Sequence, residues 1–225
     1  MKKLFALLFA LLMLLSLAAC GQKAADTHEN EAQDTPDAAA PQSAEEAAAP
    51  ALVGGWTIPE GAALSDEAKA AFEKAMDGLI GVRYEPLALL GTQLVSGTNY
   101  CILCEASVAA PDARPYYTLV YVYADLQGGA ELQNIVILDI GSIAESGEVQ
   151  PAEAAPAALM GGWTVDRDSE AQAEGVLLHL ASQVVNGTNH CLLCEGAALT
   201  FVHTDLDGGS EVIRTVTLDL GALKG

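Results

Sequence analysis

The clearest helical pattern in the chain lies at residues 66–79. Apolar side chains recur there at three-to-four spacing, and charged side chains fill the opposite side. Ser65 stands directly before the pattern, and the acidic residues Asp66 and Glu67 occupy its first two positions. This order favours a helix capped by Ser65. We expect one amphipathic helix that ends near residues 78–81 and packs on a sheet. Its apolar stripe consists of Ala68, Phe72, Ala75, Met76 and Leu79.

After residue 82 the sequence becomes rich in β-branched and aromatic residues, broken by glycine turns. The pattern predicts strands near 83–95, 100–107, 116–124 and 131–140. Hairpin turns are expected at Ser96-Gly97 and at 127–129, where glycine supplies a positive φ. One helix followed by a four-stranded antiparallel meander is an α+β arrangement, with the helix across one face of the sheet.

Several separated blocks occur twice in the same order, which indicates that one structural unit was duplicated. Gly-Gly-Trp occurs at 54–56 and 161–163, and Gly-Thr-Asn at 97–99 and 187–189. The other repeated blocks are Cys-x-Leu-Cys-Glu at 101–105 and 191–195, and Asp-Leu-x-Gly-Gly at 125–129 and 205–209.

The second copy is shorter than the first. Gln93 lies 37 positions after Trp56, whereas Gln183 lies 20 positions after Trp163, so a helix's worth of chain is missing. The interval between the last two repeated blocks is shortened as well. We therefore expect a mostly β second repeat that depends on the first repeat for burial.

The two Cys-x-x-Cys pairs invite a zinc or redox interpretation. On a strand, however, residues three apart point to opposite faces, so Cys101 and Cys104 cannot easily share a metal or a disulfide. We expect Cys104 to face the helix and Cys101 to lie on the outer face of the sheet. We hypothesise that the outer faces of the two repeats pack together. Cys101 and Cys191 would then form a disulfide in an oxidising envelope or remain reduced thiols.

No nucleophile constellation stands out in the sequence, and nothing predicts an enzyme, a cofactor or a metal site. The net charge of −20 disfavours nucleic acid and anionic lipid surfaces as partners, because both require cationic neutralisation.

The N-terminus has the pattern of an export signal. Lys2 and Lys3 precede an apolar run at 4–15 that is too short for a trusted membrane span, and small residues then lead to Cys20. The pattern resembles a bacterial lipobox, which implies cleavage before Cys20 and lipidation of its thiol. The alternative is ordinary cleavage near Ala19. With a lipidated Cys20, the protein would be anchored to a membrane of the bacterial cell envelope by lipid, on the extracytoplasmic side.

Composition predicts the organisation of the rest of the chain. A signal peptide at 1–19 is followed by a stretch at 20–50 that is rich in Ala, Glu, Gln and Pro, and its composition predicts a disordered tether. A first folded domain at 51–141, a linker at 142–158 and a truncated repeat at 159–225 are expected to follow.

The repeated blocks also carry a resemblance to a known family. Leu52-Val53-Gly54-Gly55 ahead of a helix, then Gln93-Leu94-Val95-Ser96-Gly97-Thr98-Asn99-Tyr100, then a second hairpin near Leu126, resemble the cystatin family of cysteine peptidase inhibitors, stefins included. The resemblance covers roughly residues 52–140 in full and 159–220 in shortened form. It implies a cystatin-like fold with one helix across a four-stranded antiparallel sheet, followed by a shortened, mostly β copy.

The resemblance implies reversible inhibition of papain-like cysteine peptidases by a wedge that fills the active-site cleft. Gly54, free in φ, would let the backbone turn away before a peptide bond reaches the catalytic thiol. The alternative is a non-inhibitory cell-surface module that binds a protein or peptide. The implied peptidase-binding residues are Leu52, Val53, Gly54, Gly55, Gln93, Leu94, Val95, Ser96, Gly97 and Leu126. The candidates in the second repeat are Gly161, Gln183, Val185 and Gly187.

Overall fold

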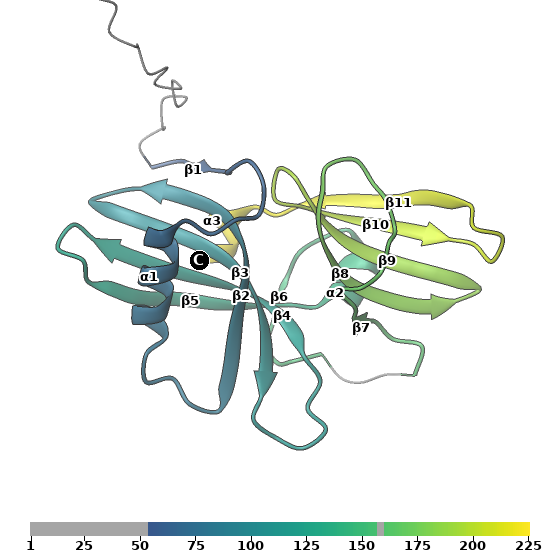
Figure 1. The fold of residues 1–225 in the computed structure, drawn as a ribbon, viewed down its shortest axis with the longest axis horizontal. Helices are drawn as coiled ribbons and strands as arrows, with labels where there is room; N and C mark the ends of the chain where they lie inside the picture. Colours follow the sequence, from purple (N-terminus) through teal and green to yellow (C-terminus); the bar gives the residue numbers. More distant parts are fainter. Residues whose placement is uncertain (1–53, 157–159) are drawn as a thin grey trace, which may run out of the picture. The chain divides into compact units, whose positions relative to one another are not determined.

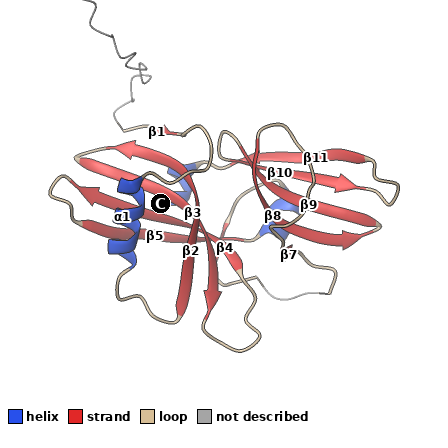
Figure 2. Ribbon diagram, viewed as in Figure 1, coloured by secondary structure: helices blue, strands red, loops and turns tan. Residues whose placement is uncertain are grey.

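The computed structural model describes residues 54–156 and 160–225, which belong to one compact unit, residues 47–225. Strands make up 48% of the structure and helices 14% (Figure 2). All strands belong to two antiparallel sheets, which we call the first and second sheets. The predicted signal peptide, Cys20, the tether, Leu52 and Val53 lie outside the described residues.

The first sheet contains six strands in the order β1-β2-β3-β4-β5-β6, and its four long central strands match the predicted meander closely (Figure 1). Two short strands were not predicted, and they extend the sheet at its edges. The strands are β1 (Trp56–Thr57), β2 (Val82–Leu94), β3 (Gly97–Val108), β4 (Tyr116–Asp125), β5 (Ala130–Leu138) and β6 (Pro151–Ala152).

The second sheet is formed by the second repeat and has five strands in the order β11-β10-β9-β8-β7. Its central hairpins reproduce those of the first sheet with shorter strands. The strands are β7 (Thr164–Val165), β8 (Val176–Val185), β9 (Gly187–Cys194), β10 (Ala198–Thr204) and β11 (Ser210–Thr217).

Helix α1 (Asp66–Met76) begins where the sequence predicts, because the Ser65 hydroxyl accepts a hydrogen bond from Ala68 N at 3.2 Å. It packs across β4 and β5. The helix ends earlier than the apolar stripe suggests, since Asp77 has extended backbone angles. Leu79 therefore leaves the stripe and is 46% exposed.

The predicted fold class is wrong, because the molecule is not one helix across a four-stranded sheet but two sheets with mostly β content. The first sheet is apolar on both faces. One face carries Ile102 and Cys104 and packs against α1. The other carries Cys101 and Leu103, and that face shares a core with the second sheet. A four-stranded sheet open to water on one side would leave this second face exposed, at a cost of about 25 cal/mol per Å² of apolar area.

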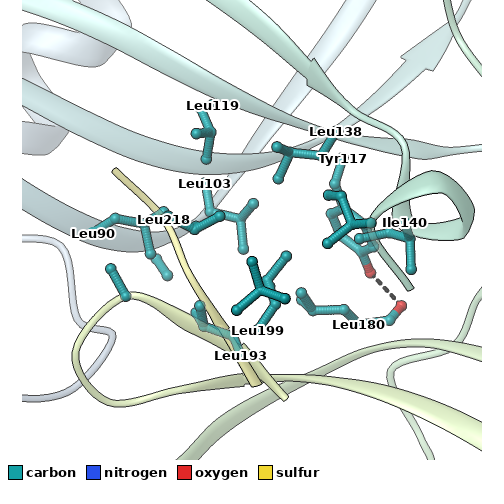
Figure 3. Close-up of a cluster of buried hydrophobic side chains, with 14 of the residues drawn as sticks. Leu90, Leu103, Tyr117, Leu119, Leu138, Ile140, Leu180, Leu193, Leu199 and Leu218 are labelled. Carbon is teal, nitrogen blue, oxygen red and sulfur yellow. Dashed lines mark hydrogen bonds between the residues drawn. The ribbon is translucent and has the colours of Figure 1, made fainter. Parts of the chain in front are cut away.

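The core between the two sheets contains Leu103 from β3 together with Leu193 and Leu199 from the second repeat, all fully buried (Figure 3). The Tyr117 hydroxyl crosses this core and donates a hydrogen bond to the Leu180 carbonyl oxygen at 2.6 Å. The outer faces of the two repeats therefore pack together, as the alternation on the strands predicts.

Each repeat also ends in a short helix that lies beside the tryptophan of the other repeat. Helices α2 (Ile140–Ser146) and α3 (Leu220–Lys224) are capped by Asp139 and Asp219. A Cβ on Gly141 of α2 would lie 3.4 Å from Trp163, and a Cβ on Gly221 of α3 would lie 3.7 Å from Trp56. These two contacts between helix and tryptophan join the repeats in addition to the core between the sheets.

Where the second repeat lacks α1, its sheet face is more polar, and Ala171 and Ala173 of a loop pack on the small apolar cluster that remains there. In the first sheet Leu89 pairs with Ile102 and Val120 with Ile135, and all four contact the α1 cluster. The corresponding pairs in the second sheet are His179 with Leu192 and Thr200 with Thr215. With fewer apolar side chains at these positions, a loop covers what the helix covers in the first repeat.

The four described cysteines are free and buried. Cys101 belongs to the core between the sheets and Cys104 to the cluster beneath α1, so the two point to opposite faces, as predicted. Cys101 and Cys191 are both thiols in the shared core, and no disulfide joins them among the described residues. Burial raises the pKa of Cys101 to about 12 and raises the pKa of Cys104 and Cys191 as well.

These thiols are expected to be unreactive in the native protein. Because the thiolate is the reactive form, iodoacetamide at about pH 8 should leave Cys101, Cys104, Cys191 and Cys194 unmodified until urea unfolds the chain. Peptide-resolved mass spectrometry reads each cysteine separately, with Cys20 excluded from the comparison. Rapid native-state alkylation of Cys101 or Cys191 would contradict the shared core.

Candidate protein-binding edge

Three segments that are distant in sequence meet at one end of the first sheet. Gly54 N donates to Leu94 O at 3.2 Å, and Gly97 pairs with Asp125 in the register of β3 and β4. We call Gly54, residues 94–97 and residues 125–129 the first edge. Because neighbouring strands lie about 4.8 Å apart, the row from β1 to β5 spans roughly 20 Å. The segments named by the sequence motifs are therefore contiguous in space.

The Gln93 side chain holds the Gly54 segment to the first hairpin. Its Nε2 donates to Gly54 O at 2.9 Å, and its Oε1 accepts from Asn99 Nδ2 at 2.7 Å. Gly54 has φ +85°, a conformation that favours glycine, and Gly55 beside it is half-buried. The Gln and Asn of the motif thus build the edge instead of projecting from it.

Gly97 fixes the first hairpin against the second. It is buried, and a Cβ there would collide with the backbone oxygen of Ala124 and lie 2.8 Å from the Tyr123 ring. The Tyr123 hydroxyl donates to Ser96 O at 3.1 Å. Only glycine allows this approach, so Gly97 sets the relative position of the two hairpin tips.

The second hairpin is closed by Asp125. Its Oδ1 accepts from Gln127 N at 2.8 Å and from Gly129 N at 2.7 Å, so its carboxylate is directed toward the turn's own amides. The intervening Leu126 is left at the tip and is 81% exposed. The turn is therefore acidic in sequence but apolar at its most exposed point.

The first edge presents an apolar surface on a rigid frame. Leu94 and Val95 of the first tip are 46% and 42% exposed, and Ser96 is exposed beside them. Exposed apolar side chains held on hydrogen-bonded turns are typical of a surface that binds another protein, since such turns lose little entropy on docking.

The second repeat builds the same features from Gly161, Gln183, Val185 and Gly187. Gln183 Nε2 donates to Gly161 O at 2.8 Å, and Gly187 is buried. Val185 is exposed at the tip. All four candidate residues of the second repeat therefore lie at one end of the second sheet.

Sequence reasoning included Asn99 in the motif without assigning it a role, and it missed Tyr123; both support the first edge through hydrogen bonds. It also missed the exposed Val184 and Leu206 in the second repeat. A signal for the last two was present, because the repeat aligns Val184 with Leu94 and Leu206 with Leu126.

Replacing Gln93 by Ala is expected to cost more stability than replacing Gln183 by Ala. Gln93→Ala leaves the buried amide of Asn99 without an acceptor, which costs about 1–3 kcal/mol. The matching Asn189 is half-buried, so water can replace the acceptor that its amide loses, and Gln183→Ala should cost less. Urea unfolding of the two variants measures the difference. Equal losses of stability would show that the hydrogen bond between the Gln and Asn side chains contributes no more in the first repeat than in the second.

Within residues 54–156 and 160–225, no group of three or more His, Cys, Asp or Glu side chains is arranged to hold a metal ion. None of the helices in that part of the chain has the length and apolar character needed to cross a membrane.

Comparison of the chain with models of protein families, with curated proteins and with solved structures found no match.

Proposed function

We propose that this protein is a reversible inhibitor of papain-like cysteine peptidases that inserts its first edge into the active-site cleft. The observation that carries the proposal is the alignment of Gly54, the Leu94–Gly97 tip and the Leu126 tip along one end of the sheet. An apolar row of this width matches what an elongated cleft needs for occlusion, and the motif resemblance supplies the class of target.

The geometry would also protect the Gly54 segment from cleavage by a bound peptidase. Gly54 N and O are both held by hydrogen bonds to strand β2, and the positive φ of Gly54 turns the chain at that point. A peptide segment fixed in this way is kept from adopting the extended conformation that attack by a thiolate requires. The inhibitor would therefore bind without being consumed.

A second candidate function is protein binding without inhibition. The observation in its favour is that Gln93 and Asn99 are fully used inside the molecule, so folding alone explains that part of the motif. In this case the exposed Leu126 and Val95 would contact a partner other than a peptidase.

We further propose that lipidation of Cys20 holds the protein at the bacterial cell envelope, where exported or foreign peptidases are encountered.

Titration of papain with the full chain distinguishes the two functions. The inhibitor proposal predicts saturable inhibition of hydrolysis of a small peptide substrate, competitive with that substrate, together with recovery of the intact chain after prolonged incubation. A folded chain that leaves the rate unchanged at micromolar concentration would overturn the inhibitor proposal and favour the binding module.

A further inference from the structure

The second repeat reproduces the side-chain clamp of the first edge, in which an Asn and a Gln join the Gly segment to the first hairpin. Asn189 Nδ2 donates to Gln183 Oε1 at 3.0 Å, and Gln183 Nε2 donates to Gly161 O, as in the first copy. Gly161 has φ +72° where Gly54 has +85°. We call Gly161, residues 184–187 and residues 205–209 the second edge.

The hairpins of the second edge approach each other as closely as those of the first, although His203 bonds the Asn189 side chain and not the backbone of the turn. A Cβ on Gly187 would collide with the backbone oxygen of Thr204 and lie 2.9 Å from His203, which takes the place of Tyr123. Asp205 Oδ1 accepts from Asp207 N at 2.9 Å and from Gly209 N at 2.7 Å. The missing helix does not affect this frame, because every one of these bonds lies within the second repeat.

At the tips of the hairpins, the second edge exposes apolar side chains as the first edge does. Val184 is 75% exposed and Leu206 is 80% exposed. The side chain of Met160, beside Gly161, is fully exposed. Nothing in the folding of the second sheet requires apolar residues at these three places, since none contacts the shared core. Their retention at the positions equivalent to the first edge indicates a contact surface for the same kind of partner.

The two edges do not compete for space. The sheets pack through their faces, so the shared core occupies the middle of the unit that contains residues 54–225. The tips of β2–β3 and of β8–β9 lie at opposite ends of this unit in Figure 1. A partner seated on one edge would therefore leave the other edge accessible.

We infer that the second edge is an independent inhibitory site, so that one chain binds two molecules of a papain-like peptidase at once. The inference rests on the proposed function of the first edge and extends it to the truncated repeat. The partner is a second peptidase, because the same frame presents the same kind of side chains in the same order.

The test is the stoichiometry of the complex with papain, measured by native mass spectrometry and sedimentation velocity. The full chain is compared with a first-edge variant (Val95→Asp, Leu126→Asp), a second-edge variant (Val185→Asp, Leu206→Asp) and the combination of all four substitutions. All substituted residues are exposed, and urea midpoints check that each variant is folded.

The inference predicts two papain molecules per unmodified chain, one for either single-edge variant and none for the combination. One papain on the unmodified chain and on the second-edge variant, with none on the first-edge variant, would overturn the second site and leave the proposed function standing. Unchanged binding by the first-edge variant and the combination, or no binding by any chain, would overturn the proposed function and the inference with it.

Discussion

Leu193→Ala is expected to destabilise both repeats together, by about 2–5 kcal/mol, although the substitution lies in the second repeat alone. Leu193 is fully buried in the core that Leu103 and Leu119 of the first sheet also line. Truncation would leave a cavity at the contact between the sheets. Because neither sheet can cover this face without the other, the cost should appear in the unfolding of the whole unit.

The two tryptophans allow the unfolding of each repeat to be followed separately. Trp56 packs on Tyr121 in the first sheet and Trp163 on Phe201 in the second, with ring centroids 5.8 and 5.6 Å apart. In protein labelled with 5-fluorotryptophan, both native ¹⁹F signals should disappear at one urea concentration, which is lower in Leu193→Ala.

The control for this experiment is Ile213→Ala, at an exposed position of β11, which should change stability by less than about 0.5 kcal/mol. Loss of the Trp163 signal in Leu193→Ala at a urea concentration where the Trp56 signal persists would contradict the shared core.

The first-edge variant, with Val95→Asp and Leu126→Asp, is expected to weaken the binding of papain to the first edge by at least about 100-fold. Apolar anchors at the centre of an interface commonly contribute about 2 kcal/mol or more each, and every 1.4 kcal/mol is a tenfold change in affinity. An aspartate at these positions would also bring an unpaired charge into the cleft. Both side chains are exposed in the free protein, so the fold should be retained.

Two matched variants test whether this loss is specific. Ile80→Asp adds one such negative charge on an exposed residue near the start of β2, at the opposite end of the strand from Leu94. The second-edge variant carries the same two added charges. The inhibition constant of the first site should be unchanged in both. Gly97 is unsuitable for substitution, because any side chain there would displace Ala124 and Tyr123. Equal weakening by Ile80→Asp would show that the effect arises from charge and not from the edge.

The local elements were predictable because their signals lie close together in the sequence. Ser65 with two acidic residues after it defines the start of α1, and alternation with glycine turns defines β2 to β5. The placement of Cys101 and Cys104 on opposite faces followed from the geometry of a strand alone.

The two-sheet architecture was not recognised as the fold class, for a physical reason. Leu103 and Leu119 show that the outer face of the first sheet is apolar, but an apolar face does not specify what covers it. The appearance of His179, Thr200 and Thr215 at positions that face α1 in the first copy does show which face of the second sheet lacks the helix. Comparison of the two copies position by position therefore carries information that neither copy carries alone.

The candidate edge was predictable in its segments but not in its construction. The resemblance stated above placed Gly54, Gln93 and Gly97 in one motif. The link from Tyr123 to Ser96 depends on the pairing of β3 with β4, which no local pattern encodes. The same holds for the inward direction of the Asp125 carboxylate, which leaves Leu126 at the tip.

Hydrogen–deuterium exchange of the full chain with and without papain tests the central claim most directly, because it asks whether the three segments act as one contact surface. The account predicts that papain slows exchange at Gly54 and Gly55, at residues 94–97 and at residues 125–129 together, while the amides of α1 exchange as in the free protein. Protection at α1, or at only one of the three segments, would contradict an edge that enters the cleft as a unit.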